Sequence, residues 1–139
     1  MKELVCIIFG TIGSFTVSLL GGWNAAMATL LIFMIIDYLT GLIVAGVFKK
    51  SLKTESGGLN SNIGFKGVCR KVMILLIVIV GKQLDLVLEI DYIGTAVIIA
   101  YIANETVSII ENAGLMGVPI PNIIKKAIDL LNKKAEVET

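Results

Sequence analysis

The chain has 139 residues, of which 56% are hydrophobic and 17% are charged, and its mean hydropathy of +0.91 is typical of a membrane protein and not of a soluble domain. Its formal net charge of +1 leaves no basic surface for nucleic acid, so a nucleic-acid-binding function is excluded. The chain lacks histidine, and its two cysteines, Cys6 and Cys69, are far apart, so we expect no metal site, cofactor, catalytic nucleophile or enzyme activity.

The first two apolar segments are joined by a short turn. Residues 4–36 carry no charge, and as a single helix they would be about 50 Å long, against a hydrocarbon core of about 30 Å. We therefore predict two membrane spans, over residues 4–20 and 25–48. The turn between them, Gly21-Gly22-Trp23-Asn24, combines turn residues with an interfacial aromatic and is expected at a membrane surface.

Small residues recur along one face of each of these segments. Gly10, Ser14 and Ser18 are spaced four residues apart in the first segment, and Gly41 and Ala45 have the same spacing in the second. Small side chains at this spacing let membrane helices approach closely. We interpret these five positions as helix-packing or oligomerisation residues.

A basic loop is predicted over residues 49–71. It holds one acid, Glu55, and six basic residues, which are Lys49, Lys50, Lys53, Lys66, Arg70 and Lys71. Basic loops remain on the cytoplasmic side of a membrane, where their side chains lie near anionic lipid. The glycine-rich stretch 56–67 does not have the spacing of a phosphate-binding loop, so we interpret it as a flexible connector.

The second half of the chain predicts two further spans and an amphipathic helix. The spans are expected over residues 68–88 and 92–110. Beyond two glycines and two prolines, apolar residues recur at helical spacing over residues 120–134, opposite charged positions that include Lys125 and Lys126. A short amphipathic helix in a membrane protein is expected to lie at the lipid interface, here on the inner leaflet.

The predicted fold is therefore an all-α integral membrane domain of about four spans with a C-terminal interfacial helix. A cytoplasmic basic loop places both termini in the cytoplasm if there are four spans. A three-span arrangement remains open, because residues 4–20 are at the short limit for crossing and the charge-free part of residues 68–88 covers only about half a span.

Charged and polar side chains within the spans are the candidate functional residues. Counting about 1.5 Å per residue places Asp37 and Lys82 at nearly the same depth, and each charge at the bilayer centre costs about 2.5–3.5 kcal/mol unless it is paired or hydrated. We expect Asp37 and Lys82 to pair or to face a common aqueous lumen, with Asp85 one turn from Lys82 and with Asn104 and Glu105 close by. The alternative is that these charges only fix the orientation of the helices.

Several motifs follow one another between residues 35 and 131. They are Asp37-Tyr38-Leu39-Thr40-Gly41, Leu59-Asn60-Ser61-Asn62-Ile63-Gly64-Phe65-Lys66-Gly67, Arg70-Lys71, Asp85, Asn104-Glu105-Thr106-Val107-Ser108-Ile109-Ile110-Glu111-Asn112 and Gly117-Val118-Pro119-Ile120-Pro121. Together they resemble the bacteriophage holin family, which includes the clostridial toxin-secretion holins. The chain departs from the pattern at residues 60–62, where a Ser-Ser pair is expected, and residues 4–23 lie outside it.

The resemblance implies a function that composition and spacing do not reveal. It implies a small protein of the bacterial inner membrane that accumulates, forms homo-oligomers and opens pores or lesions during host cell lysis. Such lesions release a phage endolysin or, in toxin-encoding relatives, large toxins. The partners would then be further copies of the chain, the lipid bilayer and, functionally, an endolysin.

Two other functions are compatible with the same residues. A small four-helix proton-coupled transporter or ion channel would use Asp37 or Glu105 as a titrating carboxylate. An antiholin-like regulatory partner would bind a holin without opening a lesion itself.

Overall fold

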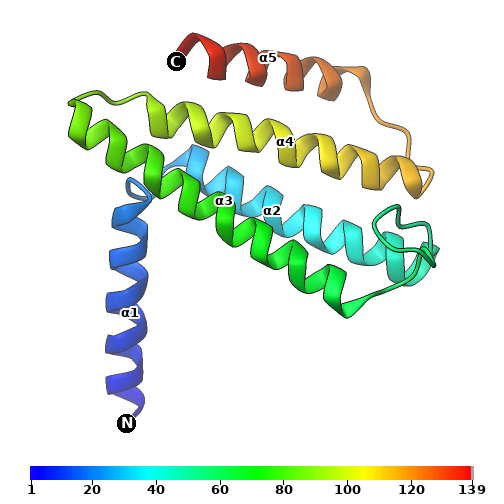
Figure 1. Ribbon diagram of the computed structural model, residues 1–139, viewed down its shortest axis with the longest axis horizontal. Helices are drawn as coiled ribbons and strands as arrows, with labels where there is room; N and C mark the ends of the chain where they lie inside the picture. The colour runs from blue at the N-terminus through cyan, green and yellow to red at the C-terminus, as the bar shows by residue number, and fades with distance from the viewer. Residues whose placement is uncertain (139) are drawn as a thin grey trace.

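The computed structural model describes residues 1–138, and these residues form helices and no strand. The helices are α1 (Lys2–Leu19), α2 (Ala25–Ile43) with a π-helical turn η1 (Val44–Phe48) directly after it, α3 (Ser61–Leu88), α4 (Ile93–Leu115) and α5 (Asn122–Glu138). Figure 1 shows α2 to α5 lying side by side, while α1 projects away from them. The predicted all-α fold class is confirmed.

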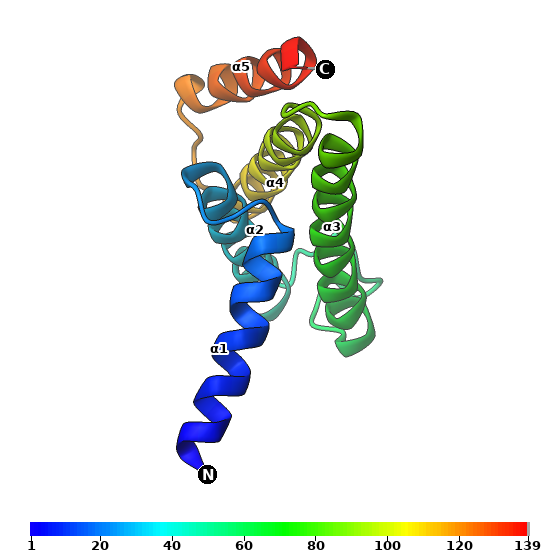
Figure 2. The ribbon, with the colours of Figure 1, turned by 90° about the vertical axis from the view of Figure 1, so that its left-hand side faces the viewer.

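The core lies between α2, α3 and α4. Figure 2 shows α2 and α3 on opposite sides of α4, and both helices pack mainly against α4 and little against each other. The buried cluster consists of Leu20, Met27, Leu30, Met34, Val78, Ile98 and Ile102. The backbones of α3 and α4 approach closely at two glycines, because a Cβ on Gly81 would lie 3.2 Å from the Cα of Gly94.

Within residues 1–138, three helical segments are long and apolar enough to cross a membrane, namely Lys2–Leu19, Ala25–Phe48 and Ile93–Leu115. Helix α3 has 28 residues, or about 42 Å, but its charged residues keep it out of this group. It lies along α4 nonetheless and begins at Ser61, well before the predicted span 68–88. Helix α3 is therefore polar over its first turns, apolar over residues 72–81, and polar again at Lys82, Gln83 and Asp85.

Helix α1 contacts the bundle only near its end. None of its residues is buried, and Leu20, which directly follows it, reaches the core. The hydroxyls of Thr11 and Thr16 each donate to a carbonyl oxygen four residues earlier, at 2.8 Å. Because these polar groups are satisfied within the helix, α1 presents an apolar surface suited to lipid or to another helix.

The predicted turn at residues 21–24 is present, and its residues explain its shape. Gly21 and Gly22 have φ angles of 88° and 85°, a left-handed conformation that glycine adopts without steric cost. Asn24 then caps α2, since its side-chain oxygen accepts from the backbone N–H of Met27 at 2.8 Å.

The glycine-rich stretch 56–67 is partly helical, which differs from the predicted connector. Asn60 caps α3 by accepting from the backbone N–H groups of Asn62 and Ile63. A Cβ on Gly64 would lie 3.4 Å from the Tyr38 hydroxyl oxygen, and one on Gly67 would lie 3.7 Å from the Tyr38 ring. These glycines therefore let the Tyr38 side chain of α2 lie close to the first turns of α3.

Helix α5 returns along α4 in the opposite direction (Figure 1). The connection between them turns at Gly117, whose φ is 80°. Leu131 packs against the core cluster and Ala135 is buried, whereas Ile123 and Leu130 are exposed. The predicted amphipathic helix 120–134 is thus present, and one of its faces lies against the bundle.

Candidate functional site

Three helices bring a charged side chain to the same level of the bundle. Asp37 lies about three helical turns before the end of η1, Lys71 about three turns after the start of α3, and Glu105 about three turns before the end of α4. At about 1.5 Å per residue each is about 15–17 Å from that end of its helix. This distance is about half the thickness of a hydrocarbon core of about 30 Å.

Lys71 joins the two carboxylates. Its Nζ lies 2.8 Å from Asp37 Oδ2 and 2.7 Å from Glu105 Oε2. Asp37 is 7% exposed and Glu105 is 6% exposed, so both ion pairs are largely shielded from solvent. One lysine therefore links α2, α3 and α4, and the three groups together carry one unit of negative charge when all are ionised.

Asn112 completes the network from the next turns of α4. Its Nδ2 donates to Asp37 Oδ1 and to the Asp37 backbone oxygen, both at 3.2 Å, and to Thr40 Oγ1 at 2.9 Å. Asn112 is 6% exposed. We call Asp37, Lys71, Glu105 and Asn112 the charge network. Within the described residues that are not exposed, every buried side-chain nitrogen or oxygen has a hydrogen-bond partner.

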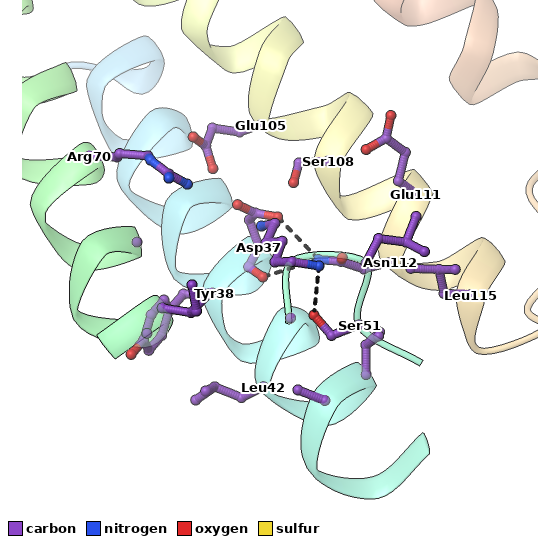
Figure 3. Close-up of a pocket in the computed structure, with 18 of the residues that line it drawn as sticks. Asp37, Tyr38, Leu42, Ser51, Arg70, Glu105, Ser108, Glu111, Asn112 and Leu115 are labelled. Atoms are coloured by element: carbon purple, nitrogen blue, oxygen red, sulfur yellow. Dashed lines mark hydrogen bonds between the residues drawn. The ribbon is translucent and has the colours of Figure 1, made fainter. Parts of the chain in front are cut away.

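A cavity of about 670 Å³ adjoins the charge network. The cavity lies between α2, α3, α4 and the loop after η1. Figure 3 shows Glu105, Ser108 and Asn112 of α4 lying across from Asp37 of α2. Its polar and charged lining residues are Asp37, Ser51, Lys53, Thr54, Arg70, Lys71, Asn104, Glu105, Ser108, Glu111 and Asn112. A cavity with this lining can hold water beside the buried charges.

The predicted pairing of Asp37 with Lys82 is wrong, because Asp37 pairs with Lys71. The depth count assumed that the third helix began near Lys71. In the structure α3 begins almost three turns earlier, at Ser61, which moves Lys71 to the level of Asp37 and Lys82 about 16 Å further along the helix. Lys71 was also expected among the lipid-facing basic residues, and it is instead part of the charge network.

Lys82 and Asp85 form a second polar cluster at the opposite end of the bundle. Asp85 accepts from the backbone N–H groups of Ile93 and Gly94 at 2.8 and 2.9 Å, so it caps α4. Lys82 Nζ lies 3.5 Å from Thr95 Oγ1. The Lys82 stem runs past the two glycines Gly21 and Gly94, with its Cε 2.6 Å from where a Cβ on Gly21 would be. We call Gly21, Lys82, Asp85 and Gly94 the turn cluster.

The small residues predicted for helix packing fall into two groups. Gly10, Ser14 and Ser18 of α1 are on an uncovered helix: Ser14 and Ser18 are exposed, and a Cβ on Gly10 would meet nothing within 4 Å. Gly41 lies next to Asn112, whose Nδ2 would be 3.8 Å from an added Cβ, and Ala45 is buried. Only the second group packs within the bundle.

The remaining predicted residues lie on the surface. Asn104 is exposed at the rim of the cavity. The other basic residues are also exposed, and they are Lys49, Lys50, Lys53, Lys66, Arg70, Lys125 and Lys126. Lys53 and Arg70 nevertheless line the cavity, so its mouth is basic while its interior holds the two buried carboxylates.

Three residues of the site were missed by the sequence reasoning. Asn112, Thr40 and Ser108 lie within motifs that were recognised, but no role was predicted for them. Asn112 follows Glu105 by two helical turns, so the two share a face of α4. That spacing could have indicated that Asn112 lies beside Glu105 in the site.

The site is suited to holding helices together and admitting water. Ion pairs that link three helices fix the position of each helix relative to the others, and residues of this kind in membranes mark functional pathways. Within residues 1–138, no group of three or more acidic or cysteine side chains is arranged to hold a metal ion.

Comparison with known proteins identifies relatives over most of the chain. The model described as the bacteriophage holin family matches residues 14–133. An uncharacterised protein of Clostridium perfringens is 35% identical over 139 residues, which cover 97% of each chain. A second, from Halalkalibacterium halodurans, is 40% identical and covers 81% of this chain and 82% of the relative.

A further relative has a functional name. A probable holin of Bacillus phage phi105 is 33% identical over 111 residues, which cover 79% of this chain and 76% of the phage protein. No solved structure matches the chain.

Proposed function

Since this chain belongs to the bacteriophage holin family, we propose that it self-assembles in the bacterial inner membrane into lesions that release an endolysin or, in a toxin-encoding context, a large toxin. The family consists of membrane proteins that act with an endolysin in lysis and is not an enzyme family. The three apolar helices agree with a membrane location.

The main support for the proposal is that α2, α3 and α4 are joined by ion pairs and hydrogen bonds, whereas α1 is not packed against them over most of its length. The charge network joins α2, α3 and α4 into one unit. Helix α1 has no buried residue, and large apolar side chains such as Phe9 and Phe15 are 72% and 65% exposed. A unit with an unpacked apolar helix is suited to pack against further copies of itself.

The basic residues support an orientation for this unit. The exposed Lys49, Lys50 and Lys53 follow η1, and basic loops remain cytoplasmic. We place this end of the bundle, and with it the cavity mouth, at the cytoplasmic face. The turn cluster then faces outward, and the N-terminus is cytoplasmic if α1 crosses the membrane. The end of α5 lies toward the start of α4 (Figure 1), so a cytoplasmic C-terminus would require α5 to leave the bundle. Lys125 and Lys126 lie in the first turns of α5, near this proposed cytoplasmic end.

Self-association is proposed to use the face of α1 that carries Gly10, Ser14 and Ser18. A matched pair of substitutions tests this face. Ser14→Leu should reduce the higher oligomers trapped by chemical crosslinking in membranes, because it fills the small-residue face. Thr16→Leu is the control, since Thr16 is on the opposite side of the same helix. Equal loss in both variants, or in neither, would contradict the proposed interface.

Inducible expression in a bacterium tests the function itself. We expect an abrupt loss of viability after a period of accumulation, followed by escape of a cytoplasmic enzyme of endolysin size. Leakage restricted to protons or small cations would instead indicate the transporter or channel function. Absence of any leakage, together with delayed lysis when a holin is co-expressed, would indicate an antiholin-like partner.

A further inference from the structure

Helix α5 packs beside the candidate membrane span α4, although it is strongly charged. Leu131 packs against a core cluster that contains Ile98 and Ile102 of α4, and α4 is a candidate membrane span. Ile98 and Ile102 lie about 8 and 14 Å from the start of α4. If α4 crosses the bilayer, the middle of α5 therefore lies within the hydrocarbon layer.

The two faces of α5 differ in chemistry. Leu131 and Ala135 lie on the face that packs against the bundle. Lys126, Asp129 and Lys133 are spaced by three and four residues, which places them together on the far face, and all three are exposed. Figures 1 and 2 show no other part of the described chain beyond that face.

Lipid cannot be the surroundings of this far face. A charged side chain at the centre of a bilayer costs about 2.5–3.5 kcal/mol on insertion scales, and three such residues share one face. Helix α5 can remain beside α4 in a membrane if these charges are hydrated or paired, and within the described residues none of the three forms an ion pair. A water-filled lumen enclosed by several copies of the chain supplies such surroundings.

We propose that the face of α5 formed by Lys126, Asp129 and Lys133 lines the aqueous lumen of the assembled lesion. The inference rests on the proposed holin function. In this arrangement the bundle faces lipid with its apolar helices, and the α4–α5 hairpin forms the lumen wall. Leaving the bundle for the inner leaflet would instead give up the packing of Leu131 and the burial of Ala135 seen in the structure.

Charge added to single cysteines after insertion tests the proposal. The background is the full chain with Cys6→Ser and Cys69→Ser, both native cysteines being exposed. Lys126→Cys and Lys133→Cys place a thiol on the far face, and Asp129→Cys is a second choice if either fails to insert. Lys50→Cys is the matched control, because it replaces an exposed lysine of the basic loop.

The measurement is the reversal potential of the early conductance steps in a planar bilayer under a KCl gradient. At about 1 M salt the Debye length is about 3 Å, so charges outside the conduction path are screened. A thiol reagent that carries a sulfonate should shift the selectivity of the α5 variants toward cations, and one that carries a trimethylammonium group should shift it toward anions, because charges along a pore set its selectivity.

The control should show no shift with either reagent. If conductance is present but the α5 variants shift no more than Lys50→Cys, the lumen-lining role is wrong and α5 lies elsewhere, with the inner leaflet as its place. If the unmodified chain gives no conductance and releases no protein from cells, the proposed holin function itself fails. The two failures are therefore distinguishable.

Discussion

The charge network and the turn cluster each contain a lysine of α3 and a carboxylate, yet they satisfy them in different ways. In the charge network Lys71 is paired with side chains of two other helices. In the turn cluster Asp85 accepts from two backbone N–H groups, and Lys82 ends beside a threonine hydroxyl. Lys71 and Lys82 are about three helical turns apart, and so lie on the same face of α3.

The difference follows from where each cluster lies. At the end of a helix, unpaired backbone N–H groups are available to a carboxylate and water is close. In the middle of a helix the backbone is fully hydrogen-bonded, so a charge can be satisfied only by another side chain or by water in a cavity. We therefore expect substitutions in the charge network to cost more than those in the turn cluster.

The largest effect is expected for Lys71→Met. The substitution leaves Asp37 and Glu105 buried without their cation, and breaking a buried ion pair in this way costs about 3–5 kcal/mol. Thermal unfolding in detergent should show a large fall in midpoint, and the cells should survive induction. Lys66→Met, an exposed position on the same helix, should change neither measurement.

A triple substitution separates charge from packing. Adding Asp37→Asn and Glu105→Gln to Lys71→Met removes the uncompensated charges while preserving side-chain shape. Stability should recover by a substantial part of the loss, because neutral amides can hydrogen-bond to one another. A triple variant as unstable as Lys71→Met alone would show that the lysine acts through its packing and not through its charge.

A smaller loss is expected for Asn112→Leu. Asn112 donates to Asp37 and Thr40 of α2, and loss of hydrogen bonds to a charged group costs about 1.5–3 kcal/mol. The unfolding midpoint should fall by less than it does for Lys71→Met. Asn104→Leu is the control on the same helix, since Asn104 is exposed. Equal unfolding midpoints for the two variants would show that the hydrogen bonds of Asn112 do not stabilise the charge network.

The comparison also explains how far the sequence could predict this molecule. Hydropathy and turn residues predicted the helices, because a span of apolar residues and a Gly-Gly turn are local properties of the chain. The start of α3 was misplaced, since Gly64 and Gly67 suggested a connector. These glycines instead accommodate Tyr38 of α2, a contact between distant parts of the sequence that no local pattern contains.

The sequence predicted two of the buried charged residues of the site, but it did not predict which residue pairs with them. Asp37 and Glu105 were recognised as charges that need partners, and both have one. The choice of Lys71 over Lys82 depended on the level at which α3 begins, so one error in a helix boundary changed the partner. Asp85 was expected beside the mid-span charges, whereas it lies in the last turn of α3 and accepts from the first N–H groups of α4.

A further prediction concerns the cap in the turn cluster. Asp85→Ala leaves the N–H groups of Ile93 and Gly94 without their acceptor, and loss of such a cap costs about 0.5–2 kcal/mol. Hydrogen exchange of the first turn of α4 should accelerate, with a modest fall in the unfolding midpoint. Asp91→Ala, at an exposed position in the same turn, should leave both unchanged. A fall as large as that of Lys71→Met would contradict the ranking of the two clusters.

The smallest net effect is expected where a glycine meets the Lys82 stem. A Cβ on Gly94 would overlap the Lys82 side chain, so Gly94→Ala must displace that stem, while alanine itself favours a helix by about 1 kcal/mol over glycine. The cost of displacing the lysine stem and the gain in helix preference oppose each other, so Gly94→Ala alone should change the unfolding midpoint little.

A double-mutant cycle resolves the two terms. Gly94→Ala should be more favourable in a Lys82→Ala background than in the native chain, because the overlap is then absent and only the helix preference remains. Contacting residues couple by about 0.5–3 kcal/mol, and the unfolding midpoints of the four proteins measure that coupling. If Gly94→Ala has the same effect in both backgrounds, the Lys82 stem does not rest on Gly94. The turn cluster would then be held by the Asp85 cap alone, and its difference from the charge network would be greater still.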